Sequence, residues 1–211
     1  MKSLLICDCD EVLLHMVRHF GQWLDEAHDI DLDMRRGEFA NAMTRRADGS
    51  QVSTDDMWDY LGGFFPAEMG RQTLVPHARE SLEALSEIAD VVILTNLLDD
   101  LHDARILQLE SHGIVHRVMC NQGGKGRPVA ELVEAHGNPV TVFVDDLPKH
   151  HESVAKHAPG VHRLHMVSEP GIASFIPAAP HAHARIDDWL EARSWITARF
   201  ASGLTAAPAG D

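Results

Sequence analysis

Residues 3–12 of the chain read Ser3-Leu4-Leu5-Ile6-Cys7-Asp8-Cys9-Asp10-Glu11-Val12. An apolar run that leads directly into two carboxylates is typical of a buried strand that ends at a reactive edge. An isolated carboxylate in the protein interior costs several kcal/mol, so we expect both acids where the strand emerges. In open α/β sheets, ligands bind at the carboxyl ends of the strands. We therefore expect the active site beside Asp8 and Asp10.

Two later segments have the same apolar character and the same kind of polar end. Residues 90–96 end in Thr95-Asn96, and residues 140–144 lead into Asp145-Asp146. Shorter strands are predicted over 114–119, 161–167 and 184–186, and the second is expected at an edge of the sheet because it contains His162 and His165. Helices are predicted after Pro76 and over 99–112, 128–135 and 187–200. This alternation predicts an α/β fold with a Rossmann-like parallel sheet flanked by helices.

Residues 15–74 show helical patterns and no strand pattern. Apolar side chains at helical spacing predict a helix over 15–28, a second helix is expected over 33–43, and the polar cluster at 53–56 favours the start of a third. We therefore predict a small α-helical cap at 15–74, inserted into a catalytic core formed by residues 1–14 and 75–200. Residues 201–211 lack a periodic apolar face and are expected to form a flexible tail.

The composition limits the possible partners and compartment. A formal net charge of -14 argues against a nucleic-acid or anionic-membrane partner, since both favour a basic surface. No stretch of about 18 apolar residues is present, so no membrane span is expected. Three cysteines without paired spacing favour buried thiols in a reducing compartment, and most of the 15 histidines are expected at the surface. These features predict a cytoplasmic protein and leave the oligomeric state open.

Four polar signals follow predicted strands or lie in a loop between them: Asp8-Cys9-Asp10, Thr95-Asn96, Lys125 and Asp145-Asp146. Each signal alone is common in turns and helix caps. In a parallel sheet they converge on one edge, because the carboxyl ends of the strands lie together there.

The order of these motifs resembles that of the haloacid dehalogenase superfamily, and specifically its aspartate-nucleophile phosphatases with a small helical cap. The resemblance covers nearly the whole chain. It implies a Mg²⁺-dependent phosphohydrolase that acts on a small phosphorylated metabolite through an aspartyl-phosphate intermediate. An acid at position 10 favours phosphate-ester chemistry, because the dehalogenases of the superfamily lack one there.

The resemblance also implies a role for each motif residue. Asp8 would be the nucleophile and Asp10 the general acid and base, whereas Thr95, Asn96 and Lys125 would bind the phosphoryl group. Lys125 would also offset charge during catalysis. The Mg²⁺ ligands would be Asp8, Asp146 and the main-chain carbonyl of Asp10, with Asp145 as a second or water-mediated ligand.

Two departures from the family pattern keep alternatives open. Family members usually have Gly and then Thr or Val after the second Asp, whereas this chain has Glu11 and Val12. Glu11 motivates the alternative of a non-catalytic module of the same fold that binds phosphate or a protein. A phosphomutase-like or phosphonatase-like relative is a further alternative. Lys125 is followed by Gly126 rather than by the commoner Pro. The histidines between 150 and 165 do not have a spacing that predicts a transition-metal site.

Overall fold

The computed structural model describes residues 2–36 and 39–207. Its core is a six-stranded sheet in the order β5-β4-β1-β6-β7-β8, in which each neighbouring pair is parallel. The strands are β1 (Ser3–Cys7), β4 (Ala89–Thr95), β5 (Arg117–Cys120), β6 (Thr141–Asp145), β7 (His162–His165) and β8 (Ala184–Arg185). The predicted α/β class with a parallel sheet is confirmed. β1 lies between β4 and β6, so the three strongest motifs follow adjacent strands.

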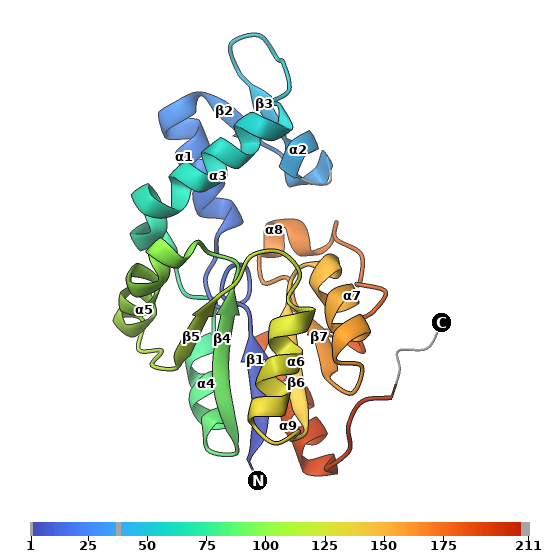
Figure 1. The fold of residues 1–211 in the computed structure, drawn as a ribbon. Helices are drawn as coiled ribbons and strands as arrows, with labels where there is room; N and C mark the ends of the chain where they lie inside the picture. Colours follow the sequence, from blue (N-terminus) through green and yellow to red (C-terminus); the bar gives the residue numbers. More distant parts are fainter. Residues whose placement is uncertain (1, 37–38, 208–211) are drawn as a thin grey trace.

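Helices cover both faces of the sheet (Figure 1). One layer contains α4 (Ala78–Ser86), α5 (His102–Ser111) and α9 (Trp189–Ser202), and the other contains α6 (Gly126–Ala135) and α7 (Pro148–His157). Successive residues of a strand point to opposite faces, so Leu5 and Cys7 pack toward the first layer and Leu4 and Ile6 toward the second. β1 is therefore buried on both sides, which explains its unbroken apolar sequence.

The predicted edge position of residues 161–167 is wrong, because β7 lies between β6 and β8. His162 and His165 are buried there. Their Nε2 atoms donate hydrogen bonds to the carbonyl oxygens of Leu204 and Asp146, at 2.9 and 2.8 Å. Polar side chains fit an inner strand when their hydrogen bonds are satisfied locally.

The predicted cap, residues 15–74, lies above the carboxyl ends of the strands (Figure 1). It contains α1 (Val17–His28), η1 (Met34–Arg36), α2 (Phe39–Ala42), α3 (Thr54–Glu68) and η2 (Met69–Arg71). Ser53 caps α3 by accepting a hydrogen bond from the Asp56 amide, as its position predicted.

The cap also contains a two-stranded antiparallel sheet formed by β2 (Ile30–Leu32) and β3 (Met43–Arg45). In place of the single helix predicted over 33–43, the described residues form η1 and α2, and Met43 already belongs to β3. Residues 37 and 38 lie outside the described residues. Ile30 and Met43 are buried in a cluster with Phe20 and Phe64. Packing of these two side chains against the helices stabilises a strand pair that local periodicity does not reveal.

The last core segments are short. η3 (Asp99–Leu101) precedes α5, and α8 (Pro170–Ala173) follows β7. Of the predicted tail at 201–211, residues 201 and 202 belong to α9, and the Ala206 amide donates to the Gly160 carbonyl at 2.9 Å. Residues 208–211 lie outside the described residues, so flexibility of the tail stays a prediction.

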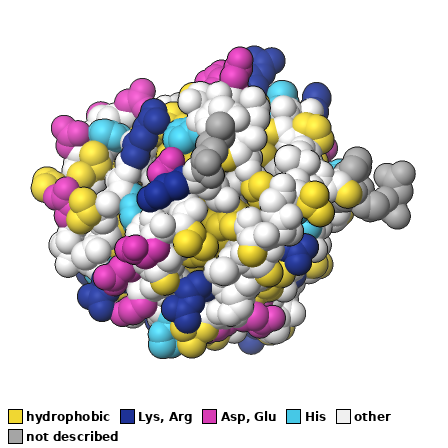
Figure 2. Space-filling view, turned by 90° about the horizontal axis from the view of Figure 1, so that it is seen from below, with side chains coloured by type: hydrophobic (Ala, Val, Ile, Leu, Met, Phe, Trp, Pro, Cys, Tyr) yellow, Lys and Arg dark blue, Asp and Glu magenta, His cyan; other side chains and the backbone are white. Residues whose placement is uncertain are grey.

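Figure 2 shows the molecule from below, at the end opposite the cap, where acidic and basic side chains are interspersed around a hydrophobic centre. This end carries the amino ends of the parallel strands and lies away from Asp8. Among the described residues, the helices are all too short or too polar to cross a bilayer.

Candidate active site

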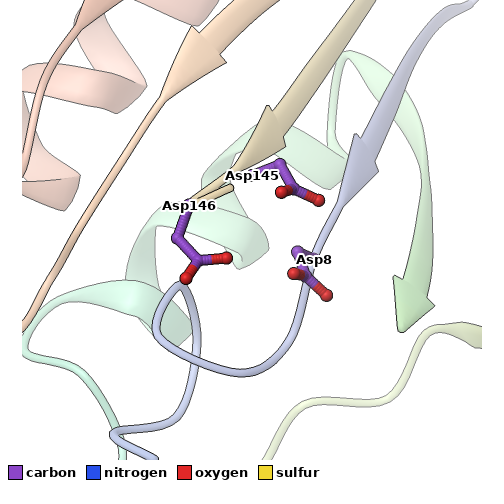
Figure 3. A group of neighbouring side chains, drawn as sticks. All are labelled: Asp8, Asp145 and Asp146. Atoms are coloured by element: carbon purple, nitrogen blue, oxygen red, sulfur yellow. The ribbon is translucent and has the colours of Figure 1, made fainter. Parts of the chain in front are cut away.

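Three carboxylates gather where β1 and β6 end. Asp8 follows β1, Asp145 is the last residue of β6, and Asp146 comes next. The two strands pair directly, with Cys7 opposite Val144, so their ends bring the acids together. One oxygen from each of the three carboxylates lies within 4.8 Å of the others (Figure 3). Oxygen donors in such a group suit a hard divalent cation such as Mg²⁺.

Lys125 is fully buried between two of these acids. Its Nζ lies 2.7 Å from Asp8 Oδ1 and 2.7 Å from Asp145 Oδ2. Burial lowers the pKa of Lys125, but the charges of Asp145 and Asp8 outweigh that effect and hold the pKa above its usual value. Lys125 is therefore a charged member of the cluster and not a solvent-exposed lysine on a glycine loop.

The glycine after Lys125 allows this placement. A Cβ on Gly126 would lie 2.1 Å from the Ser153 carbonyl oxygen, which is closer than any side chain permits. The Gly126 amide donates a hydrogen bond to Ser153 Oγ at 3.0 Å. The close approach of α6 to α7 thus fixes the start of α6, where Lys125 is the N-cap.

Asp8 and Asp146 both hold their protons more strongly than usual. Burial raises the pKa of Asp8 to about 6, an effect that Lys125 opposes and Asp145 increases. Burial and the neighbouring charges of Asp145 and Asp8 also raise the pKa of Asp146. Like charges that repel in this way are stabilised by a bound cation. The donor set therefore fits Mg²⁺.

Two histidines hold the loop that carries Asp145 and Asp146. His151 Nε2 donates to the Asp145 carbonyl at 3.0 Å, and His165 Nε2 donates to the Asp146 carbonyl at 2.8 Å. His165 Nδ1 accepts from the Ala179 amide, which fixes its tautomer. Most of the 15 histidines are at least partly exposed, as expected, but four of those between residues 150 and 165 are buried. The buried histidines are His15, His19, His150, His151, His162 and His165.

The predicted phosphate-binding residues differ in what their side chains contact. Thr95 ends β4 beside the site, and its buried Oγ1 has no hydrogen-bond partner within the described chain. A phosphoryl oxygen would supply that partner. The Asn96 side chain donates to the Gly123 carbonyl and accepts from Asn121, both at 2.9 Å. The side chain thus joins two loops, which leaves its second N–H and the Asn96 main-chain amide as donors for the phosphate.

Asp10 has partners that sequence reasoning missed. Arg105 Nη2 donates to both of its carboxylate oxygens, at 3.1 and 3.0 Å, and Gln72 Nε2 donates to Oδ1 at 2.7 Å. Arg105 comes from α5 and Gln72 from the end of the cap. The available signal was weak: Arg105 lies four residues before Leu109 and so shares its buried helix face.

Glu11 occupies the position where family members usually have Gly, and its backbone shows why Gly is favoured. Its φ is 60°, in the left-handed region. Its Oε1 accepts hydrogen bonds from the Met16 and Val17 amides at 2.7 and 2.6 Å, at the start of α1. Glu11 therefore accepts, through Oε1, from two backbone amides at the start of α1, which have no partner within the helix.

A stability measurement tests this role of Glu11. Burial raises the pKa of Glu11 from 4.5 to about 7. The folded protein then binds a proton that the unfolded chain has lost, so ionised Glu11 lowers stability increasingly as pH rises from 4.5 to about 7. E11Q keeps the oxygen that accepts from Met16 and Val17, and we expect its unfolding free energy to exceed that of wild type by about 1 to 3 kcal/mol at pH 8. The gain should vanish near pH 4, and chemical denaturation at both pH values measures it. A pH-independent difference would contradict the buried-carboxylate explanation.

No protein-family model matches the chain, and no curated protein sequence matches it either. Solved structures do resemble it. A haloacid dehalogenase-like hydrolase of Streptococcus pneumoniae is similar over 93% of this chain and 98% of its own, with a TM-score of 0.62 at 13% identity. A haloacid dehalogenase-like hydrolase of Xanthomonas campestris is similar over 96% and 97%, with a TM-score of 0.59 at 15% identity. A protein of Haemophilus somnus described as a predicted phosphoglycolate phosphatase is similar over 92% and 97%, with a TM-score of 0.58 at 14% identity.

Proposed function

We propose that this chain, which has the haloacid dehalogenase fold, is a Mg²⁺-dependent phosphohydrolase that acts on a small phosphorylated metabolite. The observation that carries the proposal is the burial of Lys125 among Asp8, Asp145 and Asp146. A purely structural ion pair needs one acid for one base. Three carboxylates around one lysine leave a formal charge of about -2, which a divalent cation would offset.

The same residues would hold the metal. Asp8, Asp146 and the main-chain carbonyl of Asp10 are its proposed ligands, with Asp145 as a further or water-mediated ligand. When bound, Mg²⁺ reduces the repulsion between the Asp8 carboxylate and the phosphate anion and polarises a phosphoryl oxygen.

Asp8 would attack phosphorus, and the bond between phosphorus and the leaving oxygen would break. Asp10 would give a proton to that oxygen. A water molecule, deprotonated by Asp10, would then attack the aspartyl-phosphate and release inorganic phosphate. Of the three N–H donors of Lys125, two go to Asp8 and Asp145, so one is left for a phosphoryl oxygen. Thr95 Oγ1 and the Asn96 main chain would bind the other phosphoryl oxygens.

The arrangement of Glu11 bears on the main alternative. A non-catalytic module was motivated by this residue, but Oε1 of its carboxylate accepts from two backbone amides at the start of α1, which gives Glu11 a structural role. The free thiols of Cys7, Cys9 and Cys120 agree with our placing the enzyme in the reducing cytoplasm. We expect contacts made when the substrate is enclosed to select the leaving group.

A screen of phosphate esters with and without Mg²⁺ tests the proposal. We expect turnover of at least one small ester with Mg²⁺, complete loss in excess chelator, and recovery when Mg²⁺ is restored. D146N is the matched variant, because it removes a proposed ligand and leaves Asp8 and Lys125 in place. It should require more Mg²⁺ for half-maximal activity. Full turnover in chelator would reject the metal role, whereas phosphate binding without turnover would favour the binding module.

A further inference from the structure

We propose that Arg105 is a positioning residue for Asp10: it orients the carboxylate through both oxygens, while Gln72 takes the second lone pair of Oδ1 and leaves that of Oδ2 to transfer the proton. The inference rests on the proposed function. It adds to that function a residue of α5 that acts on the reaction through Asp10.

The charge of Arg105 is buried in the protein interior. The Arg105 side chain is fully buried, on the same helix face as Leu109. A buried guanidinium without a charged partner costs several kcal/mol, whereas an apolar side chain would pack there without that cost. The partner is Asp10, since Arg105 Nη2 lies 3.0 Å from Oδ2 and 3.1 Å from Oδ1. Arg105 Nη1 also donates to Cys9 Sγ at 2.9 Å, which fixes the plane of the guanidinium.

The two carboxylate oxygens of Asp10 accept different numbers of hydrogen bonds. Oδ1 accepts from Arg105 and, at 2.7 Å, from Gln72 Nε2, so both of its lone pairs are used. Oδ2 accepts from Arg105 alone and keeps one lone pair. The Asp10 side chain is 18% exposed, so the carboxylate is not closed off from the site. Proton transfer to the leaving group and from water would therefore run through Oδ2.

Gln72, the second side chain that donates to Asp10, comes from the cap. Gln72 follows the last turn of the cap, and its Oε1 accepts from Gln108 Nε2 of α5 at 3.3 Å. Gln108 Nε2 also donates to the Met69 carbonyl. The Arg105 guanidinium lies 5.8 Å from the centre of the Phe65 ring of α3. Asp10 is thus held between α5 of the core and the end of the cap, so both must be in place for Oδ2 to face the reacting atoms.

A double-mutant cycle tests the inference. R105M should lower kcat for an alkyl phosphate by about 10- to 100-fold, the usual cost of misplacing a reacting group by about 1 Å, with KM little changed. An aryl phosphate needs less protonation to depart, so its phosphorylation step should slow less. In a D10N background R105M should lower kcat by no more than about twofold, the error expected for independent sites. R105K, which keeps the charge, should recover part of the loss.

A matched control separates positioning from general destabilisation. Arg163 on β7 is also buried, but its guanidinium contacts main-chain carbonyls and His183. R163M should slow both esters equally, and by the same factor in wild type and D10N. If R105M does not fold, Q72L replaces it in the cycle, because it removes the other donor to Oδ1.

The outcomes are distinct. Turnover by wild type together with equal losses from R105M in both backgrounds would overturn the inference and leave the proposed function intact. A wild-type protein that neither hydrolyses any ester nor binds orthovanadate, an analogue of the transferred phosphoryl group, would reject the proposed function and the inference with it.

Discussion

Replacing Asp8 by Asn should abolish hydrolysis and leave the fold intact. The amide keeps the shape of the side chain and an oxygen that accepts from the Cys9 amide and Lys125, which lie at 2.7 Å in the wild type. It removes the charge that attacks phosphorus. Loss of a nucleophile that acts with its partners as a unit costs on the order of 10⁴- to 10⁶-fold in kcat. Steady-state assays with saturating Mg²⁺ measure the effect.

Two further measurements on D8N complete this test: its unfolding free energy, and acid trapping of the aspartyl-phosphate. D8N removes one of three clustered negative charges, so without metal its unfolding free energy should equal or exceed that of wild type. Acid quenching during turnover should trap phosphate on Asp8 of the wild type, and mass spectrometry of the peptides should find none on D8N. Activity of D8N within tenfold of wild type, or phosphate on another residue, would remove Asp8 from the proposed mechanism.

Replacing Lys125 by Met should damage both stability and activity. Without metal, Asp8, Asp145 and Asp146 would keep their mutual repulsion and lose the buried cation that lies 2.7 Å from the first two. Breaking a buried ion pair by removing one partner costs about 3–5 kcal/mol. Denaturant unfolding at pH 8 measures this loss. Hydrolysis should also fall by roughly 10²- to 10³-fold even with Mg²⁺, the usual effect of losing one donor to the developing charge.

The pH and metal dependence of K125M show whether charge is the cause. Asp8 has a pKa of about 6 in the folded wild type against 3.8 ordinarily, so folding already favours its protonated form. Without Lys125 that preference grows, so folded K125M keeps the Asp8 proton where the folded wild type loses it, and the stability deficit should increase as pH rises above about 6. Mg²⁺ should restore stability more than activity. A deficit that depends on neither pH nor Mg²⁺ would indicate lost packing in place of lost charge.

The sheet was predictable because its signals are local. β1, β4 and β6 are buried on both faces, so each appears in the sequence as a short run of apolar residues. Thr95 and Asp145, together with Asp8, sit at the ends of these runs, and parallel pairing alone brings them to one edge. The cap was harder, because β2 and β3 have three residues each and are stabilised by contacts with Phe20 and Phe64.

The unpredicted part of the site depends on contacts between distant segments. Arg105 meets Asp10 across 95 positions of sequence, and Gln72 meets it across 62. Neither residue belongs to a motif, and each would be ordinary on a helix or loop surface. Glu11 was recognised as a departure, but its role required the position of the Met16 and Val17 amides. The roles of His151 and His165 were likewise not predictable, because nothing in their spacing shows the carbonyls to which they donate.

The central position of β1 has a consequence for biosynthesis. Leu4 pairs with Asp90 on one side and with Thr141 on the other, so its second neighbour is translated almost 140 residues later. At usual rates of synthesis the most apolar strand of the core stays without that neighbour for on the order of ten seconds. Pairings so distant in sequence also slow folding, because long loops must close first. The nascent chain is therefore most prone to aggregation through β1, the strand that leads to Asp8. We expect holdase chaperones to bind β1 until β6 has emerged.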